Sequence, residues 1–147
     1  MAHSLLEFAK ALGAMAEADM LMHESMEKAC EIVEKEAKRV IGTYDYGWPQ
    51  LAESTQKDRE AKGFSANDPL LRTGEMRDSI EHRVGLEFGN VVGIVGTDNP
   101  IAKYQELGTA KIPPRSFLGG AAMAKEHEVR AILGLGAYTA LAAQLKP

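Results

Sequence analysis

The chain has a single cysteine, no excess of basic residues and no long apolar run. Cys30 has no second cysteine with which to form an internal disulfide, as expected of a chain made in a reducing cytoplasm. The net charge of -4 at pH 7 argues against a protein that grips DNA by neutralising many phosphates. No uncharged run approaches the roughly 20 residues that span a bilayer, so no membrane partner is expected.

The length of the chain limits the number of domains. Its 147 residues are the length of one ordinary domain, so we expect residues 1–147 to form a single domain. The N-terminal residues lack the succession of basic, apolar and small residues that marks a secretory signal, so no targeting segment is expected.

A long helix is expected at the N-terminal end. Ser4 and Glu7 form a capping box, apolar residues then recur mostly three or four positions apart, and Gly42 is the expected stop. The recurring apolar residues are Leu5, Phe8, Leu12, Met15, Met22, Met26, Ala29, Val33, Ala37 and Val40. Such a helix would be about 55 Å long and would overhang a compact chain. Either Gly13 breaks it, or part of it packs on a neighbouring copy.

After Ser79 the apolar period changes to two, which predicts a β-hairpin. One face of the first strand would carry Ile80, His82, Val84, Leu86 and Phe88. Gly89-Asn90 is the expected two-residue turn, because both residues tolerate positive φ. A hairpin at about 79–97, with a possible extra strand, would form a small antiparallel sheet. We expect the long N-terminal helix and a C-terminal helix to pack on this sheet, which makes the predicted fold α+β.

Two further helical regions are predicted. A short helix is expected from Pro49 to about Lys62, because Gly63 ends it. Residues 116–145 are rich in alanine and helical in pattern. Gly134 and Gly136 weaken this pattern by about 1 kcal/mol each relative to alanine, so a kink or break is expected there.

The stretch from Val95 to Leu118 carries the most local information. Asn99-Pro100 predicts a helix start and Gly108 its end. Within this helix an apolar edge is expected to face inward, formed by Ile101, Tyr104 and Leu107, with Lys103 and Glu106 facing water. Pro113-Pro114 then fixes the backbone that presents Arg115, Ser116 and Phe117.

No catalytic, metal or cofactor motif can be assembled from the sequence. His23 has glutamate, Glu27, at the position four residues later where a zinc-protease helix needs a second histidine. No G-x-S-x-G elbow is present, and Cys30 in an apolar seam has no activating neighbour. Gly134-x-Gly136 lacks the third glycine of a dinucleotide fingerprint and follows no strand. We therefore expect a protein that is not an enzyme and takes no cofactor.

Several segments resemble phage virion morphogenesis proteins. They are Trp48-Pro49-x-Leu51-x-x-Ser54-Thr55, the stretch L-R-T-G-E-M-R-D-S-I at 71–80, Y-Q-E-L-G-T at 104–109 and P-P-R-S-F-L at 113–118. Together they are similar to the tail-completion, or minor tail component, family of long-tailed phages, related to the G protein of phage Mu. Met76 stands where that family usually has leucine, and Ser116 where a proline often follows the arginine.

The resemblance implies a structural virion protein at the head–tail junction, made in the cytoplasm of the bacterial host. It implies tail completion, head–tail joining or tail termination, which the sequence does not separate. The expected partners are further copies, closing a hexameric ring, and other neck and tail proteins such as the head connector and tail tube. DNA would pass through without specific binding. The alternatives are a cytoplasmic hydrolase, or an adaptor that binds partner helices outside the virion.

The candidate interface residues come from these motifs and from the methionine seam. They are Arg72, Arg77, Tyr104, Glu106, Pro113, Pro114, Arg115, Phe117, Met22 and Met26. The methionines either fill an irregular core or offer an adaptable surface to a partner helix. The arginines either form surface or intrachain bonds or, in the case of Arg115, bind a carboxylate or carbonyl of the adjacent subunit.

Overall fold

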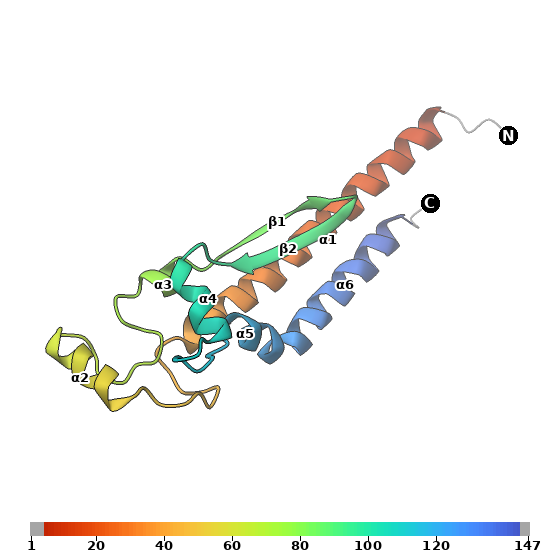
Figure 1. Ribbon diagram of the computed structural model, residues 1–147. Coiled ribbons are helices and arrows are strands. Elements are labelled where there is room, and N and C mark those ends of the chain that lie inside the picture. Colours follow the sequence, from red (N-terminus) through yellow and green to blue (C-terminus); the bar gives the residue numbers. More distant parts are fainter. Residues whose placement is uncertain (1–4, 145–147) are drawn as a thin grey trace. The chain divides into compact units, whose positions relative to one another are not determined.

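The structure, a computed structural model, describes residues 5–144 and has the α+β architecture that the sequence predicts (Figure 1). In chain order its elements are α1 (Leu5–Val40), α2 (Glu53–Ala61), α3 (Glu75–Asp78), β1 (Glu81–Glu87), β2 (Asn90–Gly96), α4 (Pro100–Leu107), α5 (Leu118–Ala124) and α6 (Glu126–Gln144). Within residues 5–144 the sheet consists of β1 and β2, so the possible extra strand is not found there.

Helix α1 is one uninterrupted helix of 36 residues. Gly13 lies inside it, so of the two alternatives a break at that glycine is wrong, and packing on a neighbouring copy stays a prediction. The stop at Gly42 is confirmed: this residue has φ +90°, and its N–H donates to the Pro69 carbonyl at 2.8 Å. Glycine takes such a φ without the steric cost that a Cβ would add. Ser4, the first residue of the expected capping box, lies outside the described residues.

The chain divides into two compact units, and α1 and both strands contribute residues to each of them. The unit of residues 32–82 and 95–125 contains the main hydrophobic core. Its buried members are Ala37, Val40, Ile41, Met76, Ile80, Ala102, Phe117 and Ala121. Phe117 is the largest of the side chains that are completely buried.

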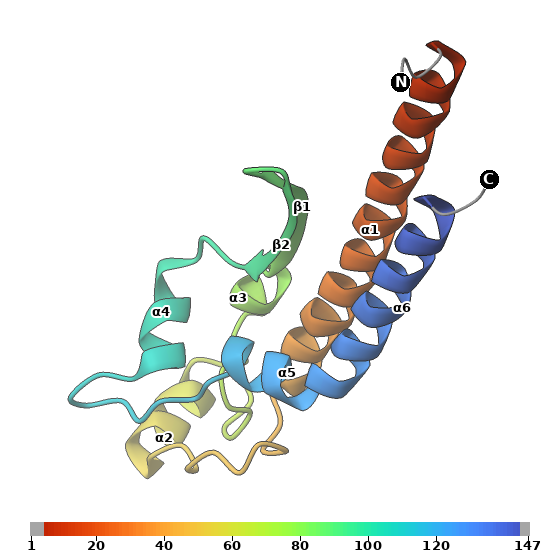
Figure 2. The ribbon, with the colours of Figure 1, turned by 90° about the vertical axis from the view of Figure 1, so that its right-hand side faces the viewer.

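The other unit consists of residues 1–31, 83–94 and 126–147, of which the structure describes 5–31, 83–94 and 126–144. In it α6 lies alongside α1, as Figures 1 and 2 show. Within this unit the buried hydrophobic residues of the two helices are small: Ala18, Ala29, Cys30, Ala140 and Ala143. A Cβ added to Gly136 would lie 2.2 Å from Ser25 Oγ. The two helices can approach this closely because glycine has no side chain.

The expected kink at Gly134 and Gly136 is wrong, because α6 runs through both glycines. The C-terminal helical region instead divides at Lys125, between α5 and α6. Gly136 serves the close approach of α6 to α1 rather than a bend in the helix.

The hairpin turn differs from the prediction by one residue. It is formed by Phe88 and Gly89, with φ of 50° and 79°, whereas Asn90 already belongs to β2. His82 and Val84 are half-buried as expected, but Leu86 and Phe88 are exposed. Their expected burial is therefore wrong. The short helix α2 also begins later than predicted, at Glu53 instead of Pro49.

Candidate functional site

The segment from Val95 to Leu118 begins with α4, whose ends follow the sequence signals. The Asn99 side chain accepts a hydrogen bond from the Ile101 N–H at 3.0 Å, and Pro100 occupies the first turn. Gly108 ends the helix with φ 73°. A Cβ on Gly108 would lie 2.8 Å from the Pro114 nitrogen, so only glycine leaves room for the chain to fold back here.

Glu106, near the end of α4, binds the first turn of α5. Its carboxylate accepts hydrogen bonds from the N–H groups of Phe117 at 2.8 Å, Leu118 at 2.9 Å and Gly119 at 2.9 Å. It also accepts one from the Ser116 hydroxyl at 2.6 Å. Because a helix start leaves its first N–H groups without intrahelical acceptors, a carboxylate here stabilises α5. Glu106 was expected to face water; it is half-buried and joins two helices of its own chain.

The loop between α4 and α5 is held by backbone bonds. The Thr109 N–H donates to the Ile112 carbonyl at 2.8 Å, and the Arg115 N–H donates to the Gln105 carbonyl at 2.7 Å. Pro113 and Pro114 are both exposed at its outer side. The stiff presentation expected from the two prolines is therefore reinforced by hydrogen bonds on both sides of them.

Arg115 and Phe117 point into their own subunit. The Arg115 side chain is only 4% exposed, and its Nη2 donates to the Pro49 carbonyl at 2.8 Å. Within the described residues its Nε has no hydrogen-bond partner. Phe117 fills the core. Both side chains therefore anchor the loop to the rest of their own chain.

The other candidate residues differ in accessibility. Arg72 is exposed, with its guanidinium carbon 4.9 Å from the centre of the Phe64 ring, where a cation–π interaction holds it. Arg77 is half-buried and pairs through Nε with Asp78 at 2.9 Å. Met22 and Met26 are half-buried on α1, away in sequence from the α4–α5 segment. A Cβ on Gly93 would lie 2.8 Å from Met26.

The apolar edge of α4 faces the opposite way from the prediction. Ile101, Tyr104 and Leu107 are all exposed, Tyr104 at 55%, whereas Ala102 is the buried residue of this helix. The spacing correctly identified a stripe, but the stripe is not the face that packs on the core. A small alanine allows α4 to approach the core closely, which leaves the larger residues outside.

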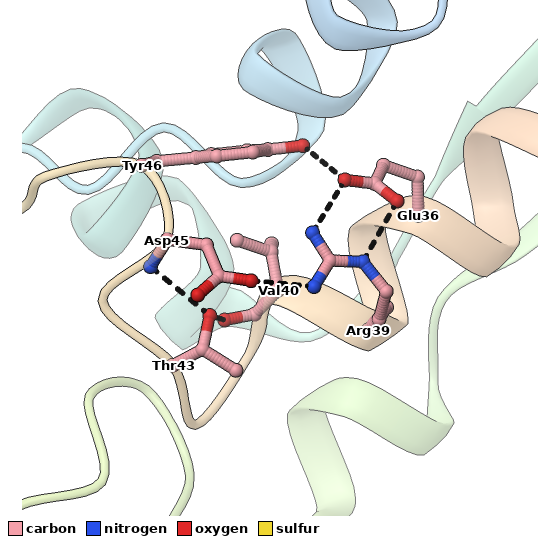
Figure 3. Close-up of polar contacts among 6 residues, drawn as sticks. All are labelled: Glu36, Arg39, Val40, Thr43, Asp45 and Tyr46. Atoms are coloured by element: carbon pink, nitrogen blue, oxygen red, sulfur yellow. Dashed lines mark hydrogen bonds and ion pairs between the residues drawn. The ribbon is translucent and has the colours of Figure 1, made fainter.

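A polar cluster at the C-terminal end of α1 and in the residues that follow it was not identified in the sequence analysis (Figure 3). The buried Glu36 carboxylate accepts hydrogen bonds from Arg39 Nε at 2.9 Å and Nη2 at 2.8 Å, and from the Tyr46 hydroxyl at 2.9 Å. Arg39 also pairs with Asp45 at 2.6 Å. The bonds from Arg39 lower the pKa of Glu36 to about 2. Burial, together with the bond to Glu36, raises the pKa of Tyr46 to about 12.

This cluster holds the chain where it leaves α1. The Thr43 hydroxyl donates to the Val40 carbonyl at 2.9 Å and accepts from the Asp45 N–H at 3.3 Å. Arg59 acts in the same way elsewhere: it is buried, and its Nη1 donates to the carbonyls of Asp68 and Leu71, both at 2.7 Å. The bonds from Tyr46 and from Arg59 join residues 9 to 12 positions apart and leave no local pattern. The pair of Glu36 and Arg39 has ordinary i,i+3 helical spacing and was overlooked.

The reactive side chains are held in unreactive forms. Burial, and then the negative charge of Glu27, raise the pKa of the Cys30 thiol, and a thiol is a poorer nucleophile than a thiolate. Tyr46 is likewise kept as a phenol. Among residues 5–144 no cluster of three or more histidine, cysteine or acidic residues is arranged to hold a metal ion. No helix in the described part of the chain is both long and apolar enough to span a bilayer.

Comparison with protein families gives a match to a family of phage proteins. Residues 5–108, from the start of α1 to the end of α4, match the family described as "Bacteriophage HK97-gp10, putative tail-component". The comparisons with curated proteins and with solved structures give no match.

Proposed function

Because the chain belongs to the HK97 gp10-like family of phage tail components, we propose that it acts as a structural subunit that closes a ring at the head–tail interface. The observation that carries this proposal is the match over residues 5–108, which spans α1, the hairpin and α4. It confirms the resemblance found in the sequence. As a tail component, the protein is part of the virion.

The exposed apolar edge of α4 supports a role in assembly. Ile101, Tyr104 and Leu107 lie on one side of this short helix and remain exposed after the chain has folded. Contiguous apolar residues on a soluble subunit are typical of surfaces that bind another protein. Tyr104 adds an aromatic ring with a polar end, a combination that is enriched at interfaces. We assign this edge to contact with a neighbouring neck or tail protein.

The net charge of the chain is compatible with a ring whose central channel does not bind DNA. At a net charge of -4 the subunit has no general excess of cations with which to hold a phosphate backbone. In a sixfold ring matched to a tail tube, DNA would pass without being gripped. Affinity for duplex DNA that persists at about 200 mM salt would contradict this part of the proposal.

The test is a phage that carries a stop codon early in this gene, with the wild-type chain supplied from a plasmid as the control. Electron microscopy of lysates should show filled heads beside free tails of normal length, and the plasmid should restore joined particles. Overlong tails would instead assign tail termination. Infectious particles of normal form without the plasmid would refute the virion role, as would absence of the chain from purified wild-type virions.

A further inference from the structure

An aromatic residue in the hairpin turn has a strained backbone conformation and a side chain exposed to solvent. Phe88 has φ 50° and is fully exposed. A Cβ makes this left-handed backbone region unfavourable, and turns of this kind favour asparagine, aspartate or glycine. Within the subunit Phe88 therefore gains no burial in return for the strain. A strained residue at a fully exposed site indicates a role in contacts outside the subunit.

Leu86 extends the same apolar surface. Alternation along β1 places it on the side of Val84, which is half-buried, yet Leu86 is exposed. In Figure 2 the turn end of the hairpin curves away from α1. The tip of the hairpin thus carries two large apolar side chains, Leu86 and Phe88, that its own subunit does not cover.

A matching uncovered surface lies on α1. The hairpin packs on this helix through Gly93, where a Cβ would lie 2.4 Å from Cys30 Sγ and 2.8 Å from Met26. The same helical stripe continues toward the N-terminus through Met22 to Met15 and Leu12, at spacings of four, seven and three residues. Met15 is 58% exposed and Leu12 is 51% exposed. The stripe therefore runs on beyond the part that the hairpin covers.

We propose that the hairpin tip of one copy, Phe88 and Leu86, packs on the Leu12–Met15 stripe of the next copy. The contact would continue the interface that Gly93 already makes with α1, with another hairpin on the same apolar stripe. Because it joins two different surfaces of the same chain, it is a heterologous contact, the type from which rings close. The proposal rests on the ring of the proposed function and identifies the surfaces that would form it.

The first test is Phe88→Asn, measured by sedimentation of the purified chain over a range of concentrations. Asparagine suits the left-handed backbone, so the variant should melt at the wild-type temperature or above it. Its self-association should weaken at least roughly tenfold, as expected when a buried aromatic anchor is removed. Ile94→Thr is the matched control, since it also removes an exposed apolar side chain from the hairpin. That variant should associate as the wild type does.

The second test identifies the partner surface. In a Cys30→Ala background, subunits with Phe88→Cys are mixed with subunits with Met15→Cys and oxidised gently. A disulfide-linked dimer should form in the mixture and to a much smaller extent in either variant alone. Equal cross-linking of Phe88→Cys with itself would indicate tip-to-tip contact and overturn the proposal.

Two other outcomes also overturn it. One is a wild-type chain that stays monomeric at every concentration, which would assign the tip to a different partner. The other is Phe88→Asn that associates as the wild type does. Neither result alters the electron microscopy of the stop-codon phage, so the ring contact and the proposed role can fail separately.

Discussion

Substitution of Gly136 by alanine tests the packing of α6 on α1. The new Cβ would lie 2.2 Å from Ser25 Oγ and 2.6 Å from Ser25 Cβ, distances that side chains do not adopt. The hydroxyl could rotate away, but Ser25 Cβ is fixed to the α1 backbone, so the helices must separate. Overpacking of this kind costs about 1–3 kcal/mol. The gain in helix propensity offsets about 1 kcal/mol, so we expect a net loss of about 0–2 kcal/mol.

Gly134→Ala is the matched control, two residues away in the same helix. Gly134 is exposed, and a Cβ there would have no neighbour within 4 Å. Alanine should therefore stabilise the protein by up to about 1 kcal/mol. Because both variants gain the same helix propensity, they should differ by the overpacking cost alone, which for a chain of this size is roughly 2–12 °C in Tm at about 2–4 °C per kcal/mol. Circular dichroism melts at one protein concentration measure this difference.

A third variant separates the clash from other effects of the substitution. Ser25→Gly removes the two Ser25 atoms with which the new Cβ would clash. The loss of stability caused by Ser25→Gly should therefore be smaller in the Gly136→Ala variant than in the wild type. If Gly136→Ala melts as high as Gly134→Ala, the close approach of the helices is not as described and the reasoning fails.

Two further predictions concern carboxylates in the unit of residues 32–82 and 95–125. Glu36 has its pKa lowered from 4.5 to about 2, so its stabilisation is complete above about pH 4.5 and is lost as the pH falls toward 2. In urea, the free energy of unfolding of Glu36→Gln should be lower than that of the wild type by roughly 2–3 kcal/mol at pH 7 and nearly equal to it at pH 2. A difference that does not change with pH would contradict this role of Glu36. Glu106→Gln should cost about 1–2 kcal/mol, because charged acceptors bind N–H groups more strongly. As a control, Lys103→Gln on the exposed side of α4 should change stability by less than about 0.5 kcal/mol in the same urea assay. Equal losses of stability in Glu106→Gln and Lys103→Gln would refute the stabilisation of α5 by Glu106.

Local chemistry predicted the ends of several elements. The start of α4 depends on Asn99 and Pro100, and its end on Gly108, all within a few residues of the helix that they limit. Gly42 ends α1 for the same kind of reason, because positive φ is available to glycine at little cost. These signals need no knowledge of the rest of the chain, and the structure confirms them.

The orientation of faces depended on contacts distant in sequence. The stripe of Ile101, Tyr104 and Leu107 was visible, but the burial of Ala102 decided which side of α4 meets the core. Arg115 reaches the carbonyl of Pro49, a residue 66 positions earlier, which no local pattern indicates. In α6, propensity alone suggested a kink at the glycines, whereas packing against Ser25 gives Gly136 a different role.

The hairpin turn was misplaced because Gly89-Asn90 has the better local turn chemistry. The chain nevertheless uses Phe88-Gly89, which places a phenylalanine at positive φ. A one-residue shift in a turn changes which residues lie at the tip. The conflict between local preference and observed turn is thus informative, since it occurs at a side chain that the subunit leaves fully exposed.

The C-terminal helices complete the units that the family-matched residues begin. The match ends at Gly108, yet Glu106 within it binds the first turn of α5, and Ser25 within it receives Gly136 of α6. Each unit therefore needs residues on both sides of that boundary. Even with these helices in place, apolar side chains stay uncovered on the hairpin tip and on α4. These two surfaces are therefore the ones that we propose for contacts with other subunits.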